Sequence, residues 1–421
     1  MGAGGSAVSP ANAGDPIAII GGGPAGASAA LRLAVAGQRA VLVERAVMPR
    51  SKVCGGCLNR RSIGALQQLG VWPPPDGMAH PLRRVDVRVA PGRRGRAGTL
   101  AGRVRPKLGG TVAVERSRFD AWMLDRVAAA GVEVIMPVRA EAVSVDAGGP
   151  GVLLASPATS GGGPDASVVR RAKIVLAADG LGGSALRAWP PAARARRRVW
   201  PVGRTMFGFG GVWADGWRLI DEDLVMIVGD AGYVGVARLP GGSIDVSAAA
   251  SPGWVRRNGG PSVALGRLLA GGGLNALAER IVSGEGPAIG GTPRLATCAA
   301  HPALPGVLRI GDAMGYAEPF TGEGMAWAMG SGIEAADVLI EAGDGLTTDR
   351  GRHAVETRWR SIARRRRRAM LGCLVLGTAI GSRRRARVAL AAARQLPPFQ
   401  RVVLNMMGRG EEARPRSGAA S

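Results

Sequence analysis

A glycine-rich loop near the N-terminus carries the clearest indication of chemistry. Gly21-Gly22-Gly23-Pro24-Ala25-Gly26 fits the pattern G-x-G-x-x-G and follows the apolar run Ile17 to Ile20. In this pattern the first glycine makes a tight turn, the second lets the backbone approach a pyrophosphate, and the third lets helix and strand pack closely. The candidate cofactor-contacting residues of the loop are Gly21, Gly23, Ala25 and Gly26.

The flanking residues supply the elements that must position this loop. Ile17 to Ile20 has the length of a buried parallel strand, and Ala27 to Ala36 is rich in Ala and Leu, which predicts a helix. Ala40 to Val43 predicts a second strand, directly followed by Glu44 and Arg45. An acid at this distance from the glycines can accept hydrogen bonds from ribose hydroxyls. The complete strand–helix–strand context favours a dinucleotide site over a chance glycine-rich loop.

The composition restricts the class of protein. The 421 residues are 46% hydrophobic but only 4% aromatic, so the core must be mostly aliphatic. The net charge is +24, and all but three of the 55 basic residues are Arg. We interpret this richness in Arg as a compositional bias that disposes the surface towards acidic partners or anionic lipid. A basic nucleic-acid-binding protein is the alternative of a different class, but the chain lacks aromatic interleaving and a recognisable nucleic-acid motif. We expect no specific nucleic-acid partner.

Cysteine usage and the ends of the chain bear on location. Four cysteines form no disulfide framework in so long a chain, which favours a reducing compartment. Residues 1–15 have neither a charged nor an apolar segment of a secretory signal, and we expect a disordered tail there. The apolar run Ala369 to Gly381 is too short to span a bilayer. We expect a cytoplasmic protein, with peripheral binding to the inner membrane face as the alternative.

The rest of the chain alternates between helical and strand-like patterns. Residues 200–250 predict an antiparallel sheet, Gly148 to Asp165 predicts a surface turn between strands, and from about Glu356 the chain is helical and basic. Strands are predicted over Arg83–Ala90, Val132–Met136, Lys173–Ala178 and Val307–Ile310, and helices over Ser117–Ala130, 262–282 and Gly324–Glu341.

Four motifs occur in a fixed order: GGGPAG, ERSRFD, AADG and GDAMGYAEPFTGEG. In this order they resemble the FAD-dependent oxidoreductases of the p-hydroxybenzoate hydroxylase fold, and within them the geranylgeranyl-reductase-like branch. The resemblance implies a mixed α/β (α+β) fold. It would contain a Rossmann-like FAD-binding domain, an inserted antiparallel β-sheet substrate domain and a helical C-terminal region. The implied boundaries are 16–75, 111–185 and 292–345 for the FAD-binding domain, 76–110 and 186–291 for the substrate domain, and 346–421 for the basic helical region.

The same resemblance implies further cofactor contacts. Arg116 matches an Arg that contacts FAD, Asp179-Gly180 matches a motif that supports FAD and nicotinamide, and Gly311-Asp312 matches an acid on the ribityl chain. Pro319, Gly322 and Gly324 lead into a helix whose N-terminus would face the flavin edge. No second G-x-G-x-x-G follows a strand, so electrons would come from transiently docked NAD(P)H or from a protein donor.

The reaction itself is less constrained by the sequence. Lys52 and Cys54 match the K-V-C-G-G segment of the reductase-like branch, whereas Cys57 is an addition. The cysteines fit a structural loop, a substrate-facing Cys54 or a redox pair, and C-x-x-C without two more close ligands predicts no metal site. Tyr233 and Pro240 match the outline of a Tyr-x-Trp-x-Phe-Pro element whose Trp and Phe are missing here.

This departure favours NAD(P)H-dependent monooxygenation (hydroxylation) of a lipophilic or aromatic secondary metabolite. Reduction of an isoprenoid C=C bond by a geranylgeranyl-reductase-like flavoprotein is the alternative. The candidate catalytic residues are Cys54 and Tyr233.

The C-terminal region is strongly basic. Between Arg358 and Arg409 there are fourteen Arg and no Asp or Glu, and apolar stretches interleave with the Arg clusters. Three interpretations remain open: a solvated helical face, an interfacial helix on anionic lipid, and a docking surface for an acidic electron carrier.

Overall fold

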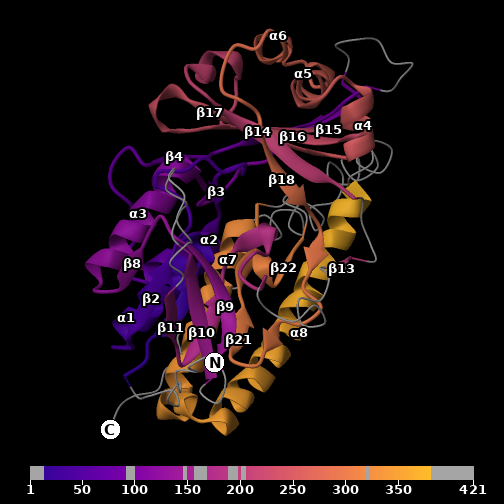
Figure 1. Cartoon of the computed structure of the whole chain (residues 1–421). Coiled ribbons are helices and arrows are strands. Elements are labelled where there is room, and N and C mark those ends of the chain that lie inside the picture. Colours follow the sequence, from indigo (N-terminus) through magenta and orange to yellow (C-terminus); the bar gives the residue numbers. More distant parts are fainter. Residues whose placement is uncertain are drawn as a thin grey trace, which may run out of the picture.

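The computed structural model describes residues 14–91, 100–145, 149–155, 168–187, 198–200, 205–317 and 322–380, with the side chains of the last helix described to Leu374. A mainly parallel sheet and its helices form one body, and a largely antiparallel sheet capped by helices lies at its far end (Figure 1). The long helix α8 (Asp349–Ile380) runs along the first body. The mixed α/β fold predicted from the sequence is confirmed.

The parallel sheet contains the strand that precedes the glycine loop at its centre. Its strand order is β20-β21-β12-β1-β2-β8, in which β20 alone is antiparallel to its neighbour. The strands are β1 (Ile17–Ile20), β2 (Ala40–Val43), β8 (Glu133–Ile135), β12 (Ile174–Ala177), β20 (Ala303–Leu304) and β21 (Val307–Arg309). β1, β2 and β12 are buried throughout, which explains their nearly continuous aliphatic sequences.

The helices on this sheet pack closely on one another because small residues line the contacts between them. α1 (Pro24–Val35) lies against α7 (Gly324–Ala342), and a Cβ at Gly332 would stand 2.1 Å from the Ala25 carbonyl oxygen. The remaining helices of this body are α2 (Arg60–Gln68) and α3 (Arg116–Ala129). The Asn59 side chain accepts a hydrogen bond from the Ser62 backbone N–H at 3.0 Å and so caps α2.

The second large sheet has seven strands in the order β18-β14-β17-β16-β15-β5-β6. Neighbours are antiparallel except β5 and β15, which are parallel. The strands are β5 (Val85–Val89), β6 (Gly102–Val104), β14 (Phe207–Trp213), β15 (Leu224–Val228), β16 (Gly232–Arg238), β17 (Ile244–Ala250) and β18 (Gly290–Arg294). The antiparallel sheet predicted for residues 200–250 forms part of it.

Strand periodicity gives this sheet two different faces. On β17, Ile244 and Val246 pack in one apolar cluster with residues of the capping helices, such as Leu265. Asp245 and Ser247 alternate with them and therefore point to the opposite face, towards the parallel-sheet body. The capping helices are α4 (Pro252–Arg257), α5 (Pro261–Gly271) and α6 (Asn275–Val282).

Three small sheets complete the described fold. One contains β3 (Cys57–Leu58), β7 (Val112–Val114) and β4 (Ala79–Pro81); one contains β9 (Arg139–Val145), β10 (Gly149–Ala155) and β11 (Val168–Arg171); and one contains β13 (Arg198–Val199), β19 (Thr297–Cys298) and β22 (Gly315–Tyr316). The short 3-10 helices are η1 (Gly180–Gly182), η2 (Gly216–Leu219), η3 (Pro240–Gly242), η4 (Gly311–Ala313) and η6 (Gly343–Thr347).

α8 is anchored to the parallel-sheet body by hydrogen bonds and by buried side chains. The Glu356 carboxylate accepts a hydrogen bond from the Gly306 backbone N–H at 2.7 Å, and the Trp359 indole N–H donates to the Arg309 carbonyl oxygen at 3.0 Å. Met370 and Leu374 are buried in the main core. The apolar stretch from Ala369 therefore begins as core. Among the described residues, no helix is long and apolar enough to cross a membrane.

The structure corrects three local predictions. Residues 149–155 form β10, which pairs with β9 and β11, so the surface turn predicted from Gly148 was wrong there; residues 156–165 lie outside the described residues. The helix predicted over 262–282 is two helices, because α5 ends at Gly271 and the chain turns through Gly273, whose φ of +82° lies outside the helical region. The last helix begins at Asp349 and not near Glu356. The predicted disordered tail falls almost entirely outside the described residues, and the domain boundaries stay predictions.

Candidate functional site

The parallel strands bring the separate motifs to one edge. Ile20, at the end of β1, is level with Val43 on β2 and with Ala177 on β12. Gly21, Glu44 and Asp179 follow these strands, and Gly311-Asp312 follow β21. In open parallel sheets ligands bind outside the carboxyl ends of the strands, so this edge is the candidate cofactor site.

The glycine loop has the shape that a phosphate requires. Gly21 has φ +111°, and a Cβ there would stand 2.5 Å from the Ala178 carbonyl oxygen. A Cβ at Gly26 would stand 1.9 Å from the Gly21 carbonyl oxygen, so this glycine allows helix α1 to pack on the turn. At Gly23 the nearest protein atom would be Arg50 Nη2 at 3.8 Å. The loop therefore leaves Gly23 open towards the cavity, where a pyrophosphate fits.

Glu44 is held rigidly beside the loop. Its carboxylate is buried and accepts hydrogen bonds from the backbone N–H groups of Gly22 at 2.7 Å and Ala46 at 2.9 Å. These two bonds orient the carboxylate and leave acceptor capacity for ribose hydroxyls. Arg45 lines the same cavity. Contact of Glu44 with a ribose stays a prediction.

Arg116 sits at the start of α3 in a bidentate ion pair. Its Nε and Nη2 each donate to an Asp120 carboxylate oxygen at 2.9 Å, and both side chains are buried. Burial would lower the pKa of Arg116, but attraction to Asp120 outweighs it and the pKa is raised. Arg50 Nη2 lies 3.4 Å from the same Asp120 carboxylate. Arg50 Nε also lies 4.0 Å from a Glu44 carboxylate oxygen, and the planar guanidinium groups of Arg50 and Arg116 suit a phosphate.

The later motifs lie around the same edge. Asp179 accepts a hydrogen bond from the Ala185 backbone N–H at 2.6 Å, and Gly180 has φ +69°. The Gly311 N–H donates to Ser331 Oγ at 2.7 Å, which ties the last motif to α7. Two further predicted residues, Gly322 and Gly324, line the inner pocket together with Asp312. Ala25 packs under the loop against α7, and Pro319 lies outside the described residues.

Two adjoining cavities follow from this arrangement. The outer cavity, of about 480 Å³, runs from the glycine loop and Glu44 to Asp245. The inner pocket, of about 190 Å³, runs from Asp312 and α7 to strands β15, β16 and β17. The residues that line both are Lys52, Val53, Arg116, Leu181 and Thr292. The cofactor edge is therefore continuous with the face of the seven-stranded sheet.

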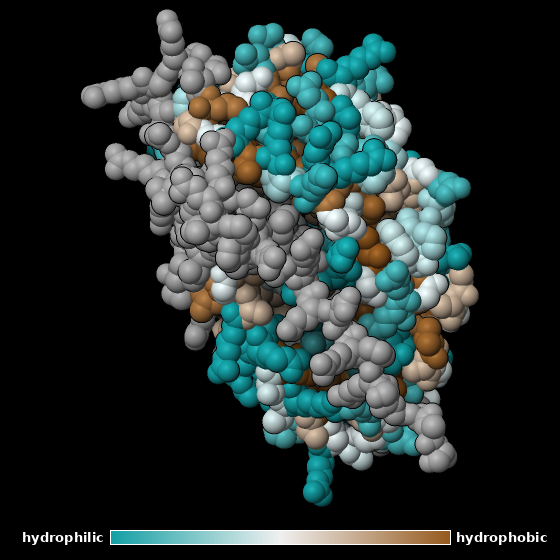
Figure 2. Space-filling view, turned by 180° about the vertical axis from the view of Figure 1, so that it is seen from behind, coloured by the Kyte–Doolittle hydropathy of each residue, from teal (hydrophilic) through white to brown (hydrophobic). Residues whose placement is uncertain are grey.

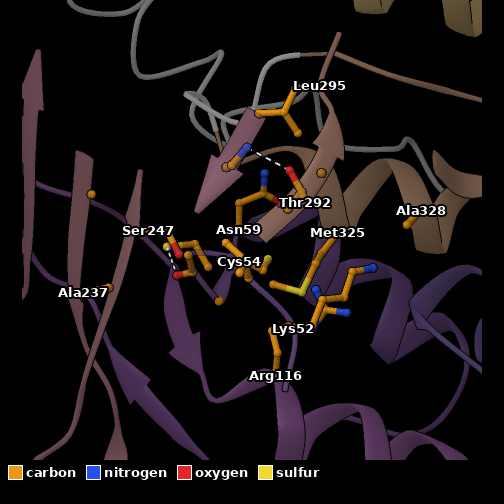
Figure 3. A pocket seen from close by; sticks show the side chains of 18 of the residues that line it. Lys52, Cys54, Asn59, Arg116, Ala237, Ser247, Thr292, Leu295, Met325 and Ala328 are labelled. Carbon is orange, nitrogen blue, oxygen red and sulfur yellow. Dashed lines mark hydrogen bonds between the residues drawn. The ribbon is translucent and has the colours of Figure 1, made fainter. Parts of the chain in front are cut away.

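The inner pocket is mostly apolar. Figure 3 shows Lys52 and Cys54 between the strand residue Ser247 on one side and the α7 residues Met325 and Ala328 on the other. Its apolar side chains include Leu108, Leu181, Leu224, Met226, Ala237, Leu295 and Met325. Most of its lining surface is apolar, which suits a lipophilic ligand oriented by some of the polar side chains that also line the pocket.

The cysteines of the predicted loop lie in this pocket as free thiols. Cys54 and Cys57 both line it, and Cys57 Sγ donates to the Gly55 carbonyl oxygen at 3.2 Å. Burial, with Cys54 and Asp245 nearby, raises the pKa of Cys57 to about 12. A thiol so hard to ionise is a poor nucleophile, which argues against dithiol chemistry. Burial, with Arg116 nearby, lowers the pKa of Lys52.

Tyr233 belongs both to the protein core and to the inner pocket. It is buried among core residues on β16 and also lines the inner pocket, as does Tyr316.

Sequence reasoning missed Asp245 and Ser247 on β17. The only available signal was an acid inside an otherwise apolar strand, IDVSAAA. Within the part of the chain that the structure describes, no group of three or more His, Cys, Asp or Glu side chains could hold a metal ion.

Comparison with known proteins assigns the family. A model of the FAD binding domain matches residues 15–232, which is more than half of the chain. The chain belongs to this family of FAD-binding flavoproteins. The loop, the acid, the buried Arg and the open surface at Gly23 fit FAD, so the protein is an FAD-dependent flavoprotein of the oxidoreductase class.

Individual proteins resemble it over different extents. The menaquinone reductase of Mycolicibacterium smegmatis is 44% identical over 55 residues, and that of Mycobacterium tuberculosis H37Rv is 40% identical over 55 residues. The match spans only 13% and 14% of those two relatives.

Solved structures match over most of the chain. A geranylgeranyl bacteriochlorophyll reductase-like protein from Thermoplasma acidophilum has a TM-score of 0.67 at 18% identity and covers 93% of this chain and 99% of its own. PqsL, a probable FAD-dependent monooxygenase from Pseudomonas aeruginosa, has a TM-score of 0.64 at 19% identity and covers 91% of this chain and 100% of its own. The predicted resemblance to the p-hydroxybenzoate hydroxylase fold is confirmed.

Proposed function

We propose that this flavoprotein reduces a carbon–carbon double bond in a lipophilic, isoprenoid-type substrate. The observation that carries this proposal is one pocket that joins the cofactor edge at Asp312 to the apolar face formed by Leu224, Met226 and Ala237. A substrate in this pocket would lie against FAD and away from water. When bound, FAD supplies the hydride and accepts electrons from a donor.

Two further observations support reduction over hydroxylation. The curated relatives that share a short segment with this chain are menaquinone reductases, so its sequence relatives include reductases. Cys54 lies at the inner pocket within the K-V-C-G-G segment. We therefore rank reduction first, although the missing Trp and Phe near Tyr233 favoured hydroxylation at the level of sequence.

The protein's own residues would bind and orient the reactants. The backbone N–H groups of the glycine loop and Arg116 would hold the pyrophosphate, and Glu44 would accept from the adenosine ribose. Asp312 would accept from the ribityl hydroxyls. The N-terminus of α7, at Gly324, would stabilise negative charge on the flavin edge. The aliphatic residues of the pocket would exclude water from the reacting bond.

NAD(P)H is the electron donor we propose. The outer cavity would be filled by the adenosine and pyrophosphate of FAD, so NAD(P)H would dock transiently at another part of this strongly basic protein. Cationic guanidinium groups suit the phosphates of such a dinucleotide. A small acidic electron carrier is the alternative donor, because the protein as a whole is strongly basic.

Hydroxylation of a lipophilic or aromatic secondary metabolite is the second candidate. The Tyr233 ring lines the inner pocket, where its hydroxyl could orient a phenolic substrate. PqsL, whose fold is similar, is described as a probable FAD-dependent monooxygenase.

An anaerobic experiment separates the two reactions. The FAD-loaded protein is reduced with NADPH under nitrogen and mixed with a short-chain prenylated naphthoquinone. A saturated product formed without oxygen supports reduction. Reoxidation that needs oxygen and yields a hydroxylated product, when a phenolic substrate replaces the quinone, supports hydroxylation, and failure of NADPH to reduce the flavin removes the proposed donor.

We also propose peripheral association with anionic membranes, which would deliver a lipophilic substrate. Arg364 and Arg368 are exposed on α8, between the buried residues Trp359 and Met370. On the face shown in Figure 2, hydrophilic side chains predominate in the described part and hydrophobic residues form small separate groups. Attraction would therefore be mainly electrostatic in the described part. The remaining Arg clusters and apolar stretches of the C-terminal region lie outside the described residues.

A further inference from the structure

Asp245 is a buried carboxylate outside the roles assigned so far. It lies on β17 and lines the outer cavity. Two residues along the same face, Ser247 lines the inner pocket. The Ser247 hydroxyl donates a hydrogen bond to a carboxyl oxygen of Asp245 at 2.6 Å. This pair is a direct link through polar atoms between the two cavities.

We propose that Asp245 and Ser247 form a proton relay that delivers a proton from the outer cavity to the substrate in the inner pocket. This inference rests on the proposed reduction, and it assigns the source of its proton.

The charged surroundings of Asp245 allow it to hold a proton. The groups that act on it are Glu115 and Arg116, at the start of α3, and Cys57 on β3. Burial raises the pKa of Asp245 to about 7, against the opposing effects of the Ser247 hydroxyl and Arg116. The neutral acid is therefore well populated near pH 7, where an ordinary Asp would be ionised.

The reduction balances with one proton from this relay. Bound FAD would supply the hydride for one C–H bond, and a proton must form the bond at the other end of the former double bond. Asp245 gives its proton to Ser247 Oγ as the Ser247 hydroxyl proton passes to the substrate. Asp245 is left as a carboxylate and regains a proton from solvent. NAD(P)H restores reduced FAD, so no further oxidant or reductant is needed.

The neighbourhood of the pair favours this role over a purely structural one. β17 pairs with β14 and β16, and Asp245 is level there with Val212 and Ala237, which offer no side-chain partner for a carboxylate. A buried acid among such neighbours costs stability unless it is neutral or paired. The strand therefore carries an energetic cost at a position that lies between the two cavities.

The first test reads the protonation of Asp245 without turnover. Infrared difference spectra of the FAD-loaded protein between pH 5 and pH 9 report protonated carboxyl groups. We expect a carboxylic-acid band that titrates near pH 7 in the wild type and in the control Asp230→Asn, which removes an exposed carboxylate. The band should be absent in Asp245→Asn. A band unchanged in Asp245→Asn would overturn the assignment of the proton.

The second test measures how the rate of product formation depends on Asp245 and on pH. The dithionite-reduced, FAD-loaded protein is mixed anaerobically with the short-chain prenylated naphthoquinone, and product formation is followed from pH 5 to pH 9. The wild-type rate should fall as the pH rises through about 7, because the neutral acid is lost. Asp245→Asn should lose about 100-fold or more at pH 6 and become nearly independent of pH, as expected when a general acid is removed.

Ser247 provides the matched pair of variants. Ser247→Ala should resemble Asp245→Asn, whereas Ser247→Thr keeps the hydroxyl and should restore most of the rate. Equal rates for the Ala and Thr variants, or a wild-type pH profile in Asp245→Asn, would overturn the relay while leaving the reduction intact. Failure of the wild type to saturate the prenyl double bond of this substrate at any pH would overturn the proposed function and the relay with it.

Discussion

Replacing single glycines of the loop by alanine should separate cofactor binding from folding. At Gly23 the backbone has φ −74° and ψ −178°, which alanine adopts without strain, and the protein atom nearest to the added methyl would be Arg50 Nη2 at 3.8 Å. Alanine lowers the entropy of the unfolded chain by about 0.4–1 kcal/mol. It is a poorer N-cap than glycine by a similar amount, about 0.5–1 kcal/mol. The free energy of unfolding of the apoprotein should thus change by less than about 1 kcal/mol.

The same methyl should weaken FAD binding, because it occupies the surface that a pyrophosphate approaches. An overpacked contact costs about 1–3 kcal/mol. The FAD dissociation constant of Gly23→Ala should therefore rise about 5- to 150-fold.

At Gly26 the expectation reverses. A Cβ there would stand 1.9 Å from the Gly21 carbonyl oxygen, whereas ordinary contacts begin near 3.4 Å. Helix α1 must move by more than an ångström, so Gly26→Ala should lose about 3 kcal/mol of unfolding free energy or more, the upper end for overpacking.

Urea unfolding of the apoproteins and calorimetric titration with FAD measure the two quantities. Gly64→Ala is the control, because Gly64 lies within α2 and a Cβ added there would have nothing within 4 Å. It should stabilise the protein by about 0.5–1 kcal/mol and leave FAD affinity unchanged. An unchanged FAD affinity in Gly23→Ala, or a loss of stability comparable to that of Gly26→Ala, would refute the assignment of the loop.

Three further predictions address other parts of the site. Glu44→Ala should weaken FAD by about 1–3 kcal/mol and also lower apoprotein stability, since two backbone N–H groups lose their acceptor; an unchanged dissociation constant in titration would remove the ribose contact. The double variant Cys54→Ser/Cys57→Ser should keep rapid flavin reduction by NADPH in stopped flow, because hydride transfer needs no thiol, and its loss with FAD still bound would indicate a dithiol relay. Arg364→Gln/Arg368→Gln should weaken sedimentation with anionic liposomes about tenfold or more at low salt, at roughly 1 kcal/mol for each Arg. Liposome binding that is unchanged by both substitutions and by added salt would indicate that α8 is only a solvated helical face.

The burial of α8 in the main core limits how the predicted membrane binding can be tested. Deletion of the basic region from residue 357 would remove Trp359, Met370 and Leu374, which are buried in the main core. Such a truncation would confound loss of membrane binding with unfolding. Substitution of exposed Arg side chains avoids this, and the FAD content of the variant serves as its folding control.

The sequence by itself determined the cofactor edge. Gly21, Glu44, Asp179 and Asp312 each follow an apolar run of strand length, and the carboxyl ends of parallel strands must meet at one edge. The local pattern G-x-G-x-x-G also indicated a phosphate-binding loop by itself, because such a loop needs only a turn and the N-terminus of the helix that follows it. Segments far apart in the chain could thus be assigned to one site without knowledge of their packing.

Only the tertiary structure showed which residues lie beside the substrate pocket. Asp245 and Ser247 are two ordinary residues of an apolar strand, and neither has a partner within a recognisable motif. They acquire a function only because β17 places one face against the capping helices and the other towards Arg116 and the loop from Lys52. Such features arise from contacts between segments that no local pattern encodes, so they could not be predicted from the order of residues.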